Sequence, residues 1–385
     1  HMEHQEDQIR IYHCGASATI AGIWMSRMMA GFAHILGRKK EKEWYQRRAG
    51  QAKKRLFNKL WDSKLGRFIY WIDESGVRHI ESQYHTYAWP VIFGITDLLD
   101  SYTSLKHLKE TLISARDIVY NSNQFPEDRL SCLGAQESIL VSGVAAVALS
   151  KIGDTETCYR ILEGCSKCIM DPPQEGQVPE QAQIDYQSYF SSAAANYLRG
   201  VIEGLFGISP DFPKNKIFIQ PCLPPHWDKS GINLGDIKLS IRQSKSAIEI
   251  KLRTETKLKH VFRIKIPVGR IRRCTLDEKK VKFTLEPGIN CFFLVTESPP
   301  SIKSDLKIMF TKQSVKLKYD KEISLGQTFC IDYAGFDIAQ ITDREGLTKR
   351  KSIQEDRVEL HLKEKIPIGS HTLFLEARVN RSMFY

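Results

Sequence analysis

The sequence predicts a helical first part and an antiparallel β second part, with the change near residue 206. Up to that point apolar residues recur every three or four positions, the period of one buried helical face. Beyond it, apolar and polar residues alternate and are interrupted by Gly and Pro, which is typical of an antiparallel sandwich. The predicted domains are 1–206, helical; 207–298, a β-sandwich; and 299–385, a second small β-rich domain.

The composition is that of an ordinary globular protein. The chain has 385 residues, 42% of them hydrophobic and 26% charged, which allows two or three domains with full cores. No run of eighteen apolar residues occurs, so we expect no spanning helix and no membrane partner. The nine cysteines are odd in number and form no disulfide framework, which predicts reduced thiols.

The first part contains about seven helical segments joined by long loops. A short hairpin interrupts them, because 62–66 reads as a turn and the following RFIYWI is rich in β-formers. In the last helix, Gly200 and Gly204 allow another helix to approach closely, and Gly207 is the expected C-cap. The expected helical segments are 20–35, 42–61, 83–99, 105–119, 135–152, 156–170 and 187–206.

The second part contains short alternating strands. A segment rich in Pro and Ser at 297–301 reads as the linker between its two domains. The expected strands are 217–221, 232–243, 247–255, 260–268, 274–285 and 290–297, and beyond the linker 306–310, 315–320, 327–334, 358–364 and 371–379.

The loop at 171–186 carries the chemistry suggested by the sequence. Two prolines at 172 and 173, Gly176 and Pro179 forbid regular helix in it. Glu175 and Glu180 therefore lie on irregular backbone, where scaffolds usually place functional side chains.

The same region resembles a known family. Residues 176–181 read Gly-Gln-Val-Pro-Glu-Gln; an aromatic, small-residue helix ending in EGLFGI (203–208) follows, and then IFIQPCLPPHW (217–227). This order resembles the end of the catalytic domain in six-hairpin, (α/α)6-barrel glycosidases of the glucoamylase and α-L-rhamnosidase types. The resemblance covers roughly 83–227.

The resemblance implies an (α/α) toroid. Such a barrel has twelve helices, so about seven correspond to a partial (α/α)6 barrel, close to its second half. We therefore expect an open apolar flank, against which the missing N-terminal half of the barrel or a second chain packs.

The resemblance also implies a carbohydrate substrate and makes Glu180 one of two catalytic carboxylates. Glycoside hydrolysis needs one carboxyl group to protonate the leaving oxygen and another to activate water or attack carbon. The family pattern favours inversion, with Glu180 as general base. Glu175 is its nearest competitor, and Glu137 is the partner if the acid lies within this chain. The alternative for Glu180 is a surface glutamate beside a proline.

Polar and aromatic residues elsewhere in the helical part suit a sugar site. Sugars present hydroxyl groups to amides and carboxylates, and apolar faces to aromatic rings. Helix-start or turn positions explain several of these residues equally well. The expected substrate-binding residues are Tyr84, His85, Trp89, Asp128, Gln136 and Gln181.

We expect no metal and no cofactor. Cys165 and Cys168 form a Cys-x-x-Cys, but no second pair or spaced histidines accompany it, which favours buried thiols over a zinc or redox site.

The chain's basic charge lies in its second part, where residues 206–385 carry 33 Lys and Arg against 21 Asp and Glu. The run at 269–282 is either a solvated strand face or a contact for an acidic polysaccharide or nucleic acid. Because no nucleic-acid-binding motif accompanies it, we expect no nucleic-acid partner.

Three functions fit these observations. The first is a glycoside hydrolase acting on an oligo- or polysaccharide. The second is a non-catalytic carbohydrate-binding or structural fragment that lacks a complete acid and base pair. The third is a glycoside phosphorylase, because LPPHW (223–227) also resembles that group.

Overall fold

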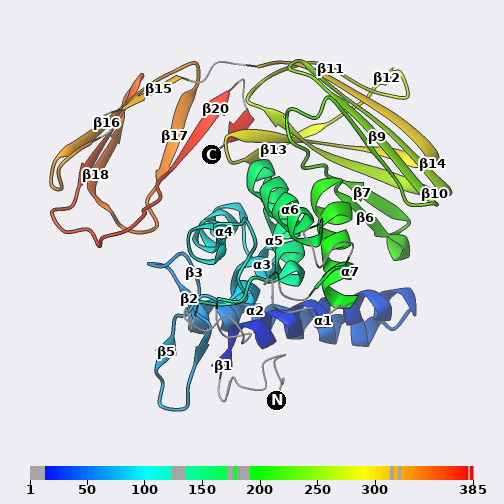
Figure 1. Ribbon diagram of the computed structural model, residues 1–385. Helices are drawn as coiled ribbons and strands as arrows, with labels where there is room; N and C mark the ends of the chain where they lie inside the picture. The colour runs from blue at the N-terminus through cyan, green and yellow to red at the C-terminus, as the bar shows by residue number, and fades with distance from the viewer. Residues whose placement is uncertain are drawn as a thin grey trace. The chain divides into compact units, whose positions relative to one another are not determined.

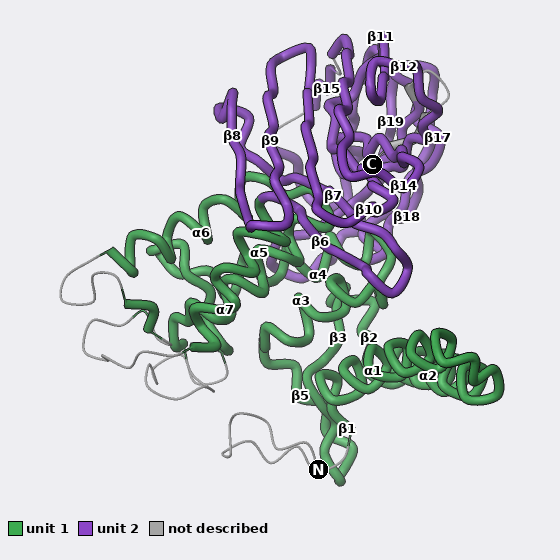
Figure 2. The backbone as a smooth tube through the Cα atoms, turned by 90° about the vertical axis from the view of Figure 1, so that its right-hand side faces the viewer, with its two compact units in different colours: residues 1–205 green, residues 206–385 purple. Residues whose placement is uncertain are grey.

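The structure is a computed structural model of the 385-residue chain (Figure 1). It describes residues 14–123, 135–170, 177–179, 182, 191–312, 316–319, 322–379 and 382–384. The chain forms two compact units, His1–Leu205 and Phe206–Tyr385 (Figure 2). The first is mainly helical and the second consists of β-strands, so the predicted change from helix to strand near residue 206 is confirmed.

The helical unit contains seven α-helices and several two-residue strands in its described part. The helices are α1 (Ala16–Ile35), α2 (Lys39–Leu60), α3 (Tyr84–Ile92), α4 (Leu98–Leu112), α5 (Ile139–Ile152), α6 (Thr155–Met170) and α7 (Ser191–Arg199), and a π-helical turn, Gly200–Leu205, continues α7. The strands are β1 (Cys14–Gly15), β2 (Trp61–Asp62), β3 (Arg67–Phe68), β4 (Trp71–Ile72) and β5 (Arg78–His79).

Helix α5 is the centre of this unit. It is apolar all round, as a helix must be to be buried on every side, and it packs on α3, α4, α6, α7 and the π-helical turn. Glycines permit the closest approaches: a Cβ on Gly143 would lie 2.0 Å from the carbonyl oxygen of Asn196 in α7. A Cβ on Gly204 would lie 3.3 Å from the backbone of Ala146, and one on Gly200 would lie 3.0 Å from Gly143, so the predicted role of Gly200 and Gly204 is confirmed.

The boundaries of α3 and α4 differ from the prediction. A single helix was expected over 83–99, but α3 ends at Ile92, since Gly94 adopts a positive φ of 60°. Helix α4 then starts at Leu98, where the side chain of Asp97 caps its first turn by accepting a hydrogen bond from the amide of Asp100. The expected helix over 105–119 ends at Leu112, and Ile113 and Val119 instead form an antiparallel bridge.

Helices α1 and α2 form a hairpin that runs out from the rest of the helical unit (Figure 2). Its base belongs to an apolar cluster that includes Ile20, Leu56 and Phe68. Farther out, α1 keeps only small residues such as Ala30 and Ala33 buried, while its other side presents large apolar side chains that are 41 to 66% exposed. These residues, called the α1 stripe below, are Trp24, Met25, Met28, Met29, Phe32, Ile35 and Leu36.

The β unit is built on one nine-stranded sheet and two smaller ones. The large sheet contains β6 (Ile208–Asp211), β7 (Lys216–Ile219), β8 (Lys229–Asn233), β9 (Ile237–Gln243), β10 (Ala247–Pro267), β11 (Gly269–Leu276), β12 (Lys279–Lys280), β13 (Thr284–Gly288) and β14 (Cys291–Lys312). The smaller sheets contain β15 (Lys316–Tyr319), β16 (Thr328–Ala334), β18 (Thr348–Ile353) and β19 (Arg357–Leu362), and β17 (Asp337–Thr342), β20 (Phe374–Val379) and β21 (Ser382–Phe384).

Strands β10 and β14 form the central pair of the large sheet. They pair antiparallel from Ala247 opposite Met309 to Pro267 opposite Cys291, and β7 joins β10 in parallel. The prediction of a linker at 297–301 is wrong, because β14 continues through these residues without a break. Pro300 lies opposite Lys259, next to a register shift in which strict ladder pairing is interrupted, and proline is tolerated there. The predicted domain boundary at 298/299 thus falls within a strand.

Among the residues that the structure describes, no helix is long and apolar enough to cross a membrane.

Candidate active site

Several segments predicted to bind substrate meet along one stretch of backbone, 120–122. On one side, Gln83 forms an antiparallel bridge with Ser122, and the amide of Tyr84 donates to the carbonyl of Asn121 at 3.3 Å. On the other side, Tyr120 forms a bridge with Glu137, and the amide of Asn121 donates to the carbonyl of Gln136 at 3.0 Å. The start of α3 and the residues before α5 are therefore neighbours, although they are about fifty residues apart in sequence.

Ala182, which belongs to the loop at 171–186 (called the glutamate loop below), bonds at the same place. Its amide donates to the carbonyl of Glu137 at 2.9 Å, and its carbonyl accepts a hydrogen bond of 2.7 Å from Nη2 of Arg116. Nη2 of Arg116 also donates to the Oε2 carboxylate oxygen of Glu137. Glu180 and Gln181 precede Ala182 directly and, like Glu175 and Asp128, lie outside the described residues.

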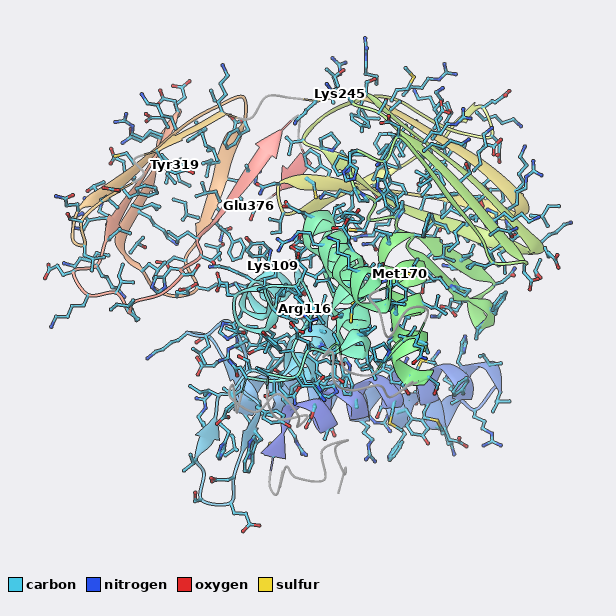
Figure 3. All side chains as sticks on the ribbon, viewed as in Figure 1. Lys109, Arg116, Met170, Lys245, Tyr319 and Glu376 are labelled. Carbon is cyan, nitrogen blue, oxygen red and sulfur yellow. The ribbon has the colours of Figure 1, made fainter. Side chains whose placement is uncertain are left out.

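Arg116 and Glu137 form an ion pair in which Glu137 is buried and Arg116 is partly exposed. The Glu137 carboxylate is about one tenth exposed, whereas Arg116 keeps 43% of its side chain accessible among the helices (Figure 3). The hydrogen bond to Glu137 raises the pKa of Arg116 above its ordinary value, against the opposing effect of burial. The guanidinium of Arg116 therefore bonds to the Glu137 side chain and to the backbone at Ala182 at the same time.

Tyr84, His85 and Trp89 form one aromatic cluster on the first turns of α3. The ring of His85 lies 3.7 Å from that of Tyr84 and 4.1 Å from that of Trp89, between ring centroids. Tyr84 and His85 are only 4% and 3% exposed, whereas Trp89 is half-buried. Of the three, Trp89 has the most surface available to a sugar ring.

Two buried glutamines lie on the segments that flank residues 120–122. Gln136 is fully buried, and its Oε1 accepts a hydrogen bond of 2.6 Å from Nδ2 of Asn121. Its Nε2, and both polar side-chain atoms of Gln83, have no hydrogen-bond partner within the described residues. Because buried amides are normally satisfied, these atoms are the ones most in need of further polar partners in this region.

A second set of buried polar side chains lies next to the start of α3. Oγ of Ser82 contacts Nε2 of His107 at 3.3 Å, and Arg67 lies over the ring of Tyr87 at 5.6 Å. Burial, with the charges of Arg67 and Lys106 adding to it, lowers the pKa of His107 to about 4. Burial raises the pKa of Tyr87 to about 12, so His107 and Tyr87 are both neutral at pH 7.

The Cys-x-x-Cys pair is part of the core of the helical unit. Cys165 and Cys168 lie on α6 and are buried, and burial raises the pKa of Cys165 to about 12. Cys168 also contacts the Ala182 carbonyl through its sulfur, at 3.6 Å. Within the part of the chain that the structure describes, no group of three or more His, Cys, Asp or Glu side chains is arranged to hold a metal ion.

Sequence reasoning missed Arg116 and Asn121, which connect the predicted segments. Both lie after α4, and Arg116 lies where the helix over 105–119 was expected. Their contacts join residues 15 to 66 positions apart. One signal was available: Ser114-Ala-Arg-Asp117 has the composition of a turn, and Asp117 does adopt a positive φ of 62°.

No protein-family model matches the chain, and no curated protein sequence matches it. Among solved structures, it is similar to an α-L-rhamnosidase from Dictyoglumus thermophilum, with 14% identity, a TM-score of 0.48, and 73% of this chain and 30% of that one covered. It is similar to an α-L-rhamnosidase from Streptomyces avermitilis complexed with L-rhamnose, with 11% identity, a TM-score of 0.45 and coverages of 75% and 26%. A neutral trehalase from Saccharomyces cerevisiae has 14% identity, a TM-score of 0.34 and coverages of 42% and 30%. The chain spans less than a third of the length of each of these structures.

Proposed function

We propose that the chain is part of an inverting glycoside hydrolase of the six-hairpin type, with Glu180 as its general base. The observation that carries the proposal is the placement of Ala182. Two residues after Glu180, the loop that resembles the family's glutamate loop is bonded to Glu137 and Arg116. We propose the glycosidase activity, the (α/α) toroid and the carbohydrate substrate together.

The proposed site combines the groups that glycoside hydrolysis needs. Trp89 offers a ring face for a sugar, and Gln83 and Gln136 offer amide atoms that have no partner among the described residues. Asp128 and Gln181, from the loops that end at this site, are the further substrate-binding candidates. As general base, Glu180 takes a proton from the water that attacks the anomeric carbon.

Glu137 has two possible roles in this site. It is the candidate for the general acid, which must carry a proton before the reaction. Its bond to Arg116 instead supports a positioning role, because a guanidinium partner stabilises the charged carboxylate. The general acid then comes from another loop of the complete barrel.

The test uses 4-nitrophenyl glycosides, including the α-L-rhamnoside and α-glucoside, with the complete protein that contains this chain and with its Glu180→Gln variant. An amide cannot accept the proton, so we expect turnover to fall by about a hundredfold or more while the melting temperature is unchanged. Equal turnover in both proteins would contradict the role of Glu180. Absence of any hydrolysis would favour the non-catalytic alternative, and hydrolysis that depends on inorganic phosphate would favour the phosphorylase.

Glu137→Gln separates its two roles in the same assay. If Glu137 is the acid, the variant loses activity on substrates with poor leaving groups but retains it on 4-nitrophenyl glycosides, whose leaving group needs no proton. If Glu137 positions the loop, activity falls on both kinds of substrate.

A further inference from the structure

A cavity of about 740 Å³ in the helical unit is lined mainly by one face of α2. Four cationic side chains line it, from Arg47, Arg48, Arg55 and Lys59, together with the ring of Trp44 and the amide of Gln51. No acidic residue is among its described lining residues. Overall, α2 carries nine Lys or Arg against two Glu, although residues 1–205 as a whole are close to neutral.

These cations are not used in ion pairs within the described part of the chain. Arg48 lies over the Trp44 ring at 5.3 Å, and the ion pairs among the described residues include none of the four. Like charges gathered around one cavity repel each other, and a bound anion would remove that repulsion. The lining therefore fits an anionic ligand with an apolar face for Trp44 and hydroxyl groups for Gln51.

A second basic cavity, of about 550 Å³, lies in the β unit. Its lining includes Arg270, Arg272 and Lys312, from the paired ends of β11 and β14. Ile271 pairs with Phe310 and Arg273 with Met309, so Arg272 is the extra residue of a β-bulge. Bulges of this kind redirect a side chain, and here the bulged residue joins the cationic lining.

We infer that both cavities bind the acidic groups of an anionic polysaccharide, whose repeating carboxylates are contacted by arginines in each unit. The inference rests on the proposed function and names its class of substrate. A polymer suits both cavities because it carries many carboxylates, and these match the cationic lining of each cavity by itself. Arginine suits this ligand because its planar fork binds a carboxylate through two hydrogen bonds.

Nucleic acid is also a polyanion, but the linings do not favour it. Single strands are held by several aromatic side chains on which successive bases stack. In the described linings of the two cavities, Trp44 is the one aromatic residue. One aromatic ring at each site is enough for a sugar polymer. A single-stranded nucleic acid needs several aromatic rings.

The experiment measures binding of polygalacturonate, with dextran as neutral polymer and single-stranded DNA as competing polyanion, by affinity electrophoresis at several salt concentrations. The binding protein is the Glu180→Gln variant, so that hydrolysis plays no part. Arg47→Glu/Arg55→Glu tests the first cavity and Arg270→Glu/Arg272→Glu the second. Their controls are Lys40→Glu/Lys54→Glu, exposed on the same helix, and Arg273→Glu on the same strand; these residues do not line the cavities.

We expect each cavity variant to weaken polygalacturonate binding by about tenfold or more, and each control by less than about threefold, with unchanged circular dichroism and melting temperature. Salt should weaken binding by the parent protein more than binding by the cavity variants, because screening acts on the charges that were removed. The inference is overturned if controls and cavity variants lose binding equally, if dextran binds as well, or if DNA binds more tightly through the same arginines. Polygalacturonate binding without hydrolysis of any glycoside would sink the proposed function alone; hydrolysis of neutral glycosides without polygalacturonate binding would sink this inference alone.

Discussion

At the residue scale, Arg116 connects the glutamate loop to the rest of the helical unit. One nitrogen of its guanidinium donates to both Glu137 and the carbonyl of Ala182. Arg116→Ala would leave a nearly buried carboxylate and a backbone carbonyl without their donor. We expect it to lower the free energy of unfolding by about 1 to 3 kcal/mol, measured by urea denaturation.

The neighbouring Arg160→Ala is the matched control for this prediction. Arg160 pairs with Asp117, but its side chain is half exposed and its partner one third exposed. Such a pair contributes less than about 1 kcal/mol. If the two alanine variants were equally stable, Arg116 would have no special structural role at the glutamate loop.

A pH-dependent stability is expected from His107. Its pKa is lowered to about 4 in the folded chain, chiefly by burial, and returns to about 6.5 on unfolding. Between these values the unfolded chain binds a proton that the folded chain does not, so the stabilisation is complete above pH 6.5 and is lost as the pH falls toward 4. We expect His107→Gln to flatten the dependence of melting temperature on pH in this window.

His34, which is exposed on α1, provides the comparison. The variant His34→Gln should keep the slope of the parent protein. If the melting temperature of His107→Gln depended on pH as steeply as that of the parent protein, other groups would be the cause of the pH dependence.

The candidate residues could be predicted from sequence only in part. The Pro-Glu-Gln loop was recognisable because its residues are consecutive, and so was the aromatic run at the start of α3. Arg116 was not, because its importance comes from contacts 21 and 66 residues away that no local pattern encodes. The burial of Tyr84 and His85 was equally hidden, since a helix start looks the same in sequence whether or not it is covered.

At the element scale, the packing of α5 on α7 depends on the absence of a side chain at Gly143. A Cβ there would lie 2.0 Å from a backbone oxygen of α7, and backbone cannot yield as a flexible side chain can. We expect Gly143→Ala to lower the free energy of unfolding of the helical unit by about 3 kcal/mol or more. Calorimetry of the 385-residue chain measures this as a lower transition temperature.

Gly50→Ala is the control, and we expect it to change the free energy of unfolding in the opposite direction. Gly50 lies within α2, and no atom lies within 4 Å of where its Cβ would be. Alanine there should stabilise the helix by about 0.5 to 1 kcal/mol. A destabilisation of similar size in both variants would mean that the contact with α7 is not the cause.

Element types were predictable where one period extends over many residues, as in α6 and the strands after 206. Element ends were not always predictable. Helix α3 stops because Gly94 takes a positive φ and Asp97 caps the next helix, although apolar residues continue through the break. Strand β14 continues through a Pro-Pro pair because a register shift removes the need for regular ladder hydrogen bonds there.

At the scale of the whole molecule, the α1 stripe is an exposed apolar surface in the helical unit. Its residues follow helical spacing on the side of α1 away from the buried Ala30 and Ala33. Such a patch marks an interaction surface, and we propose that the missing half of a barrel, or a second chain, covers it. The toroid itself remains a proposal.

The stripe predicts how the isolated 385-residue chain behaves. We expect it to bind a dye that reports apolar surface and to self-associate at high concentration, and we expect Met28→Lys/Phe32→Lys to reduce both effects without lowering the melting temperature. Light scattering after size exclusion measures the association. Strict monomers that bind no dye, in parent and variant alike, would argue against an open flank.

The continuity of β14 restricts how the C-terminal half of this protein can be exchanged between proteins during evolution. Residues 306–309 pair with β10 on one side and β11 on the other. A recombination at residue 298 would remove this central segment and leave both neighbours with unpaired edges, which invite aggregation. A crossover after Lys312 transfers the two smaller sheets and leaves the large sheet intact. A segment that can be exchanged between proteins therefore begins after Lys312.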